Sequence, residues 1–162
     1  MRSSRGILLM AVLCLISILL LLCWGELGRQ AEQYRAARLV SQSAQARGLA
    51  LAGLQDFLAK WNRDYDFPPR PPQGAAYFTY LEELDDFQSP EKIGSYRVTV
   101  DESYKLAPYK ILRVTSEGVV GPSDRPQCLW RIVATLDVSP KSRTGIGPNP
   151  HLGNWIEWRE GF

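Results

Sequence analysis

The stretch ARGLALAGLQDFLAKW, residues 46–61, decides how this chain folds. Its apolar and small residues recur at spacings of three and four, which places them along one side of an α-helix. This stripe consists of Ala46, Ala50, Gly53, Leu54, Phe57, Leu58 and Trp61. A helix with one apolar face buries that face against another element, so we expect a β-sheet to lie on it.

The sequence before this stretch also favours a helix. Residues 27–62 contain no proline and are rich in Ala, Leu, Gln, Arg and Glu, which are good helix formers. The first half of this segment is mostly polar, and Arg29, Glu32, Arg35 and Arg38 follow one another at intervals of three. We interpret these four charges as a solvated helix face.

An apolar run, Ile7–Trp24, stands further upstream, with Ser17 as its only clearly polar residue. A helix of this run spans roughly 27 Å, close to the hydrocarbon thickness of a bilayer. The run exceeds the apolar core of a signal peptide and no small-residue cleavage site follows it, so we expect a retained single span. No stop signal separates it from the next segment. The sequence predicts one helix continuing to about Asn62, with Gly25 and Gly28 as its weak points.

The orientation of the span follows less directly from the charges beside it. Arg2, Arg5 and the α-amino group precede the run, and Arg29, Arg35 and Arg38 follow it. The positive-inside rule is therefore nearly balanced. The short N-terminal segment favours an N-terminus on the inner side, with the bulk of the chain exported.

The segment DFPPRPPQG, residues 66–74, ends the helix with four prolines. We interpret it as a stiff connector that turns the chain back, and keep a ligand for a proline-reading domain as the alternative. The following AAYFTYLEELDDF, residues 75–87, indicates a short helix or an irregular turn. We expect Tyr77, Tyr80, Leu81 and Leu84 on one side of it.

Three β-rich segments come next: GSYRVTVD (94–101), PYKILRVTS (108–116) and CLWRIVATLDVS (128–139). Their alternating pattern predicts an antiparallel meander with one buried face. We expect residues 116–118 to form a turn after the second strand. NWIEWRE (154–160) can form a final strand, which would place Trp155 and Trp158 on opposite faces.

The expected fold class is therefore α+β, with a long N-terminal helix packed on a small antiparallel sheet. The long helix comprises a transmembrane part followed by an amphipathic part. The residues predicted to join helix and sheet are Leu54, Phe57 and Trp61 on the helix, and Val98, Val100, Ile132, Ala134 and Leu136 on the sheet.

The composition argues against several classes of function. The formal net charge of +2 is too mild for a nucleic-acid-binding face. Cys14 and Cys23 lie in the apolar run, which leaves Cys128 without an intrachain partner in the exported part. His151 is the only histidine, so neither a Cys/His zinc site nor a triad has its residues. We expect no catalysis, cofactor, metal or nucleic-acid partner.

This layout resembles the type IV pilin architecture. Arg5-Gly6-Ile7 resembles the short basic leader, ending in glycine, that a prepilin peptidase cuts before the apolar segment. GSYRVTV, YKILRVTSEGVVG and WRIVATLDV resemble the sheet of minor pilins and of the minor pseudopilins of type II secretion. The resemblance implies a leader (1–6), a transmembrane helix (7–28), an amphipathic continuation (29–64) and an exported α+β domain (65–162).

The resemblance implies a structural subunit that primes or caps a type IV pilus or a type II secretion pseudopilus. Its partners would be other pilins or pseudopilins through the N-terminal helix, a prepilin peptidase, and the membrane. The implied location is the bacterial inner membrane, crossed once, with a cytoplasmic N-terminus and a C-terminal domain in the periplasm or in an extracellular fibre.

One position departs from the family pattern. Major pilins carry a glutamate at the fifth mature position, which would be Ala11 after cleavage at Gly6. Its absence is typical of non-repeating subunits near a fibre tip, and equally of an ordinary anchored protein. The alternatives are therefore a single-pass exported scaffold domain of another envelope complex, without enzymatic activity, and an anchored enzyme or ligand-binding domain.

Overall fold

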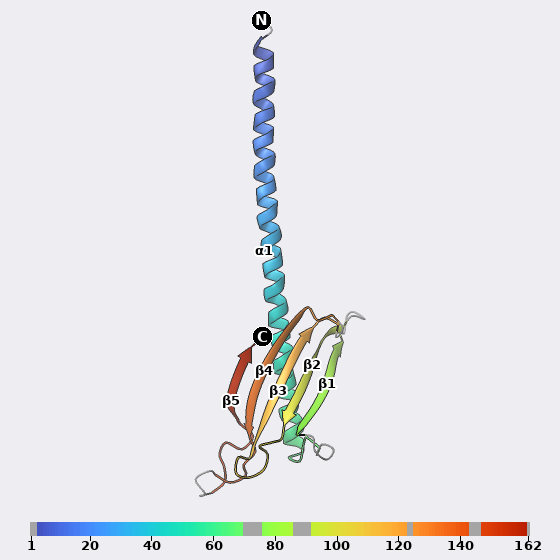
Figure 1. The fold of residues 1–162 in the computed structure, drawn as a ribbon, viewed down its shortest axis with the longest axis vertical. Coiled ribbons are helices and arrows are strands. Elements are labelled where there is room, and N and C mark those ends of the chain that lie inside the picture. The colour runs from blue at the N-terminus through green and yellow to red at the C-terminus, as the bar shows by residue number, and fades with distance from the viewer. Residues whose placement is uncertain (1–2, 70–75, 86–91, 123–124, 143–146, 162) are drawn as a thin grey trace. The chain divides into compact units, whose positions relative to one another are not determined.

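A computed structural model describes residues 3–69, 76–85, 92–122, 125–142 and 147–161 of the chain (Figure 1). Within these residues one helix precedes five strands: α1 (Ser3–Arg63), β1 (Tyr77–Asp85), β2 (Lys92–Asp101), β3 (Ile111–Val120), β4 (Cys128–Asp137) and β5 (Trp155–Gly161). The chain divides into two compact units, Met1–Val40 and Ser41–Phe162, and each is described by itself.

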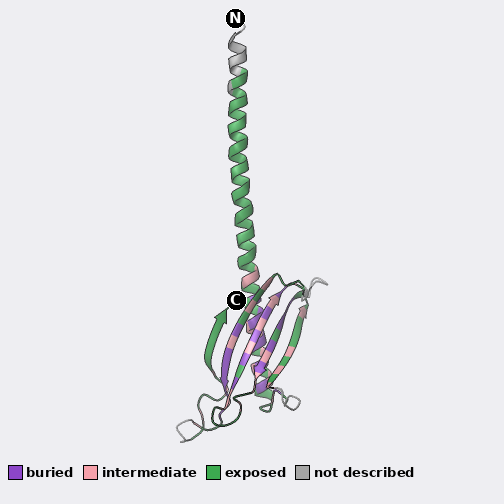
Figure 2. Ribbon diagram, viewed as in Figure 1, coloured by how far each residue is buried: buried purple, intermediate pink, exposed green. Residues whose placement is uncertain are grey.

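The first unit is helical from Ser3 to Val40, and Gly25 and Gly28 do not interrupt the helix. Every described side chain from Leu9 to Val40 is exposed, as the green ribbon in Figure 2 shows. The hydroxyl of Ser17 donates a hydrogen bond to the carbonyl of Leu13 at 2.8 Å. The one polar group in the apolar run is therefore satisfied inside its own helix.

The second unit contains a single described sheet with strand order β1-β2-β3-β4-β5, in which each strand pairs antiparallel with its chain neighbour. The last turns of α1, from Ser41 onward, pack on one face of this sheet. The predicted α+β class is confirmed, with its long N-terminal helix and its antiparallel meander. Burial in Figure 2 is concentrated where this part of α1 meets the strands.

The helix ends at Arg63, one residue beyond the predicted end. Lys60 and Arg63 lie in its last turn, where cations interact favourably with the helix dipole. The amide of Asp64 still bonds to the carbonyl of Lys60 at 3.0 Å, and the prolines that begin at Pro68 prevent continuation. The predicted connector lies outside the described residues beyond Pro69.

The prediction of a short helix or turn in AAYFTYLEELDDF was wrong. Residues 77–85 form β1, an edge strand that pairs with β2 over its whole length. Phe78, Tyr80 and Leu84 are half-buried against the core at a strand-like period of two. Leu and Glu have good helix propensity, but pairing with β2 overrides that weak preference.

The predicted turn at Ser116-Glu117-Gly118 was also wrong, because β3 continues to Val120. Gly118 pairs with Trp130 on β4 and with Tyr96 on β2. A glycine here serves the close approach of α1 to the sheet rather than a change of chain direction.

A third correction concerns Trp155 and Trp158, which share one face of β5. The register shifts between Thr135 and Leu136, so that Trp155 pairs with Leu136 and Trp158 with Ala134. Ala134 and Leu136 are both fully buried on the inner face. The irregularity of the register thus turns both indoles towards this face, and their ring centroids lie 6.5 Å apart.

Candidate functional site

The structure gathers all the predicted helix–sheet residues into one buried cluster. Each has at most 3% of its surface exposed: Leu54, Phe57, Trp61, Val98, Val100, Ile132, Ala134 and Leu136. The ring of Phe57 lies 5.8 Å from that of Phe67 and 6.4 Å from that of Trp155. Leu112 and Val114 were not predicted, although their alternation on β3 carries the same signal. Leu49 on the helix was not predicted either.

Two glycines set the distance between α1 and the sheet. A Cβ at Gly118 would meet the carbonyl oxygen of Ala46 at 2.1 Å and the amide nitrogen of Ala50 at 2.4 Å. A Cβ at Gly53 would lie 2.4 Å from the hydroxyl of Ser116. The backbone of α1 therefore lies closer to the sheet than it could if either position carried a side chain.

A bidentate ion pair fastens β5 to α1. The Arg47 guanidinium donates to both carboxylate oxygens of Glu160, at 2.7 and 2.9 Å, and the Trp158 indole donates to the same carboxylate at 2.9 Å. The hydrogen bond from Arg47, followed by that from Trp158, lowers the pKa of Glu160 to about 2. Because the ion pair is bidentate, it also fixes the orientation of the Arg47 and Glu160 side chains relative to each other.

We therefore expect a pH-dependent contribution of Glu160 to stability. A glutamate has a pKa of about 4.3 in an unfolded chain, so the lowered folded pKa stabilises the protein above that pH. This stabilisation is lost progressively as the pH falls from about 4.3 towards 2. Urea unfolding of the wild type and of Glu160→Gln should differ most near pH 7, and the difference should shrink in this acidic window. A difference that is independent of pH would contradict this assignment.

A second polar cluster joins α1 to β1 on the other side of the helix. The Lys60 ammonium lies 2.7 Å from Asp56 and 3.1 Å from Glu82, and the Tyr80 hydroxyl donates to Asp56 at 2.9 Å. Burial, followed by the bond to Asp56, raises the pKa of Tyr80. Burial lowers the pKa of Lys60, but its hydrogen bonds to the two carboxylates outweigh that effect and raise it. These groups satisfy one another, which suits a structural fastening.

Neither polar cluster was predicted from the sequence. Arg47 and Glu160 are 113 residues apart in the chain, and Lys60 and Glu82 are 22 apart. Nothing in either local segment distinguishes these side chains from ordinary surface charges. Only the position of β1 and β5 at the two sheet edges, flanking the helix, brings them together.

On the outer face of the sheet, Arg113, Val133, Glu157 and Arg159 line a shallow hollow of about 210 Å³. Its carboxylate is already engaged, because Glu157 pairs with Arg159 at 2.5 Å and accepts from the Thr135 hydroxyl at 3.3 Å. The described residues contain no group of three or more His, Cys, Asp or Glu side chains arranged to hold a metal ion.

The residues singled out for reactivity lie apart from one another. His151 is exposed in the β4–β5 connection, where its backbone amide donates to the Asn149 side chain. Cys128 is a half-buried free thiol at the start of β4, and Cys14 and Cys23 are exposed on α1. Within Ser41–Phe162, Cys128 lies at the start of β4 and His151 lies beyond its end, so these two described side chains do not share a site.

Gly6 and Ile7, the predicted processing residues, lie within α1, and their side chains are outside the described set. Among the described residues, α1 is the helix that is long and apolar enough to cross a membrane. None of its most apolar stretch is buried inside the described part of the protein. The strongest candidate for a functional surface is therefore this uncovered apolar segment, with Leu21 and Trp24 exposed to 73% and 80%.

No family model, curated protein or solved structure matches this chain.

Proposed function

We propose that this chain is a minor pilin or pseudopilin, a structural subunit that primes or caps assembly of a type IV pilus or a type II secretion pseudopilus. The observation that carries the proposal is an uncovered apolar helical segment that continues without a break into a segment packed on an antiparallel sheet. Leu21 and Trp24 are exposed in the first segment, and Phe57 is fully buried in the second.

The uncovered segment needs an apolar environment, which a bilayer or a bundle of similar helices supplies. Helices associate in lipid through close packing and a few polar contacts. Ser17 already bonds within its own helix, so association would rest on the apolar side chains. The proposed partners are other pilins or pseudopilins, and the proposed location is the inner membrane with the sheet domain exported.

Ala11 defines the role proposed within such a fibre. After cleavage at Gly6, the new N-terminal ammonium at Ile7 can pair with a carboxylate offered by another subunit. This chain offers no carboxylate at Ala11 in return. A subunit that receives this contact but does not offer one suits the end of a fibre.

The proposal predicts a low copy number and loss of fibres or secretion when the chain is deleted. Ala11→Glu should leave assembly intact, because the proposed position needs no carboxylate there. Quantitative mass spectrometry of purified fibres measures the copy number. An assembly assay of the deletion strain and of Ala11→Glu measures fibre formation or secretion. A repeating majority of this chain along the shaft would exclude a tip-proximal role.

The absence of a glutamate at Ala11 also favours a second candidate, a single-pass exported scaffold of another envelope complex. Such a protein would have no reason to carry that carboxylate. It would keep its first six residues, and its deletion would leave fibres and secretion unaffected.

A further inference from the structure

The connection between β2 and β3, residues 102–110, presents an apolar tip to solvent. Leu106 has 79% of its surface exposed, the largest fraction among the large apolar side chains described in Ser41–Phe162. Ala107 and Pro108 beside it are exposed as well. No described side chain covers Leu106–Pro108, which we call the loop tip.

The loop tip is held in place by the backbone around it. The amide of Lys110 bonds to the carbonyl of Leu106 at 3.2 Å, and that of Ile111 bonds to the carbonyl of Tyr104 at 3.0 Å. The carbonyl of Lys110 in turn accepts from the amide of Val138 at 3.1 Å. The backbone that carries the exposed leucine is thus preformed by the fold, which lowers the ordering cost of binding.

Tyr104 and Tyr109 flank the loop tip in the sequence. The rings of Tyr104 and Tyr109 meet edge to face with centroids 5.4 Å apart, and 38% and 55% of these residues are exposed. Tyrosine is enriched where hydrocarbon meets water in a membrane, because its ring is apolar and its hydroxyl is polar.

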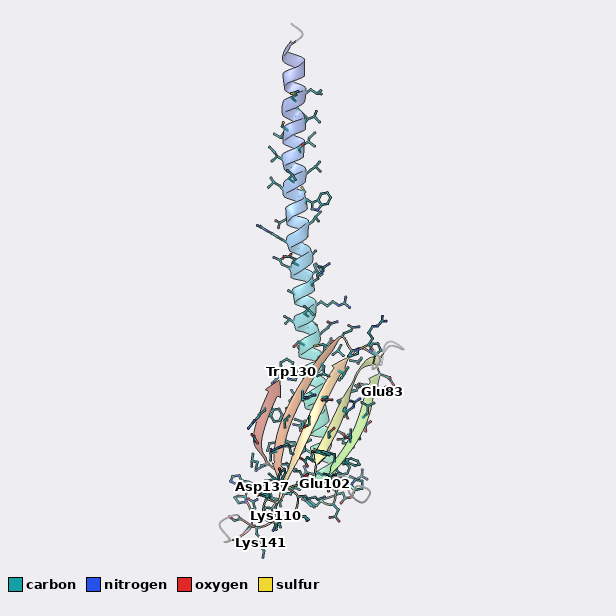
Figure 3. All side chains as sticks on the ribbon, viewed as in Figure 1. Glu83, Glu102, Lys110, Trp130, Asp137 and Lys141 are labelled. Carbon is teal, nitrogen blue, oxygen red and sulfur yellow. The ribbon has the colours of Figure 1, made fainter. Side chains whose placement is uncertain are left out.

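Lysines complete the arrangement at this end of the sheet, where Figure 3 shows Lys110 and Lys141 together with Glu102 and Asp137. The carboxylate of Asp137 accepts from the backbone amide of Ser139 at 2.9 Å. Glu102 is engaged by Lys105, at 3.8 Å. Neither Lys110 nor Lys141 has an ion pair among the described residues. Lys110 has a φ of 50°, a left-handed conformation that glycine would adopt with less strain.

We propose that the loop tip docks on an anionic lipid surface, with Leu106 in the hydrocarbon, the two tyrosines at the interface and the lysines among the headgroups. The order from apolar tip to aromatic ring to free ammonium matches the order of chemistry met on leaving a bilayer. Anionic headgroups complement the lysines, and an apolar tip this exposed gains from burial in lipid. This proposal stands apart from the proposed role in a fibre.

The test places a fluorophore at the loop tip of the full chain. The chain, with its native cysteines replaced by serine and Ala107→Cys labelled, is held in nanodiscs of phosphatidylcholine. Vesicles of roughly one third phosphatidylglycerol and two thirds phosphatidylcholine are added. Nitroxide-labelled lipid is placed in the vesicles in one series and in the nanodisc in another. Quenching from the anionic vesicles is the expected result. No quenching from these vesicles, or quenching from the phosphatidylcholine nanodisc alone, would overturn the proposal.

Three substitutions sharpen this test. Leu106→Asp should abolish quenching, and Lys110→Gly, which fits the left-handed backbone, should weaken binding to the anionic vesicles about fivefold. Ile156→Asp, at a 51% exposed position of β5, is the matched control and should change nothing. Equal losses from Leu106→Asp and Ile156→Asp would contradict the assignment. The assignment would also be contradicted if Leu106→Asp dissociated an oligomer of this chain and left quenching unchanged. In that case the loop tip would bind a second copy of the chain and not lipid.

Discussion

Replacing Gly118 with leucine should strongly lower the free energy of unfolding of the sheet domain. The new Cβ would lie 2.1 Å from the carbonyl oxygen of Ala46 and 2.4 Å from the amide nitrogen of Ala50. Both obstacles are helix backbone and cannot rotate away, so α1 must leave the sheet. Overpacking of a core costs typically about 1–3 kcal/mol, and we expect the upper end of this range or more. Urea unfolding of the full chain in detergent, followed by tryptophan fluorescence, measures it.

Gly48→Ala is the matched control on the same helix. Its Cβ would meet nothing within 4 Å, and alanine is favoured over glycine in a helix by up to about 1 kcal/mol. This variant should therefore be slightly more stable than the wild type. Equal tolerance of Gly118→Leu and Gly48→Ala would mean that α1 does not lie against β3 as the structure has it.

Phe57→Ala should lower the free energy of unfolding by about 3–5 kcal/mol, the usual cost of removing a fully buried phenylalanine ring. Phe57 is 0% exposed and lies between the rings of Phe67 and Trp155. Neither neighbour belongs to the helix, so the cavity cannot close by a local adjustment of α1. The same urea titration provides the measurement.

Gln55→Ala, at an exposed position two residues away, serves as the control for Phe57→Ala. It should change the stability by less than about 0.5 kcal/mol. A loss below about 1 kcal/mol for Phe57→Ala would show that the sheet has a different cover.

The helix and its contact with the sheet could be predicted because both rest on periodicity. Leu54, Phe57 and Trp61 repeat at helical spacing, and Val98 and Val100 alternate as a strand buried on one side must. Burial on a single face leaves this signature in the sequence. The long helix, the meander and the residues between them follow from it.

The strand edges could not be predicted in the same way. β1 is an edge strand with only intermediate burial, and its Leu and Glu residues resemble a helix until β2 pairs with them. The irregular register of β5 places Trp158 on the face of Trp155, because one extra residue reverses the alternation. Gly118 resembles a turn residue, since the approach of a helix backbone leaves no local mark.

The polar contacts and the loop tip depend on topology. Arg47 meets Glu160 only because β5 lies at the edge of the sheet beside α1. Leu106 in YKLAPYK is a plausible strand residue by sequence, and its exposure follows from the end of β2 at Asp101 and the start of β3 at Ile111.

The N-terminus of the membrane-extracted chain tests the central claim most directly. The protein is expressed with and without a prepilin peptidase, and its intact mass is measured together with its N-terminal sequence. We expect removal of residues 1–6 and a new N-terminus at Ile7 only when the peptidase is present. Retention of Met1 in its presence, or a cut beyond Trp24, would contradict the assignment to the pilins and pseudopilins.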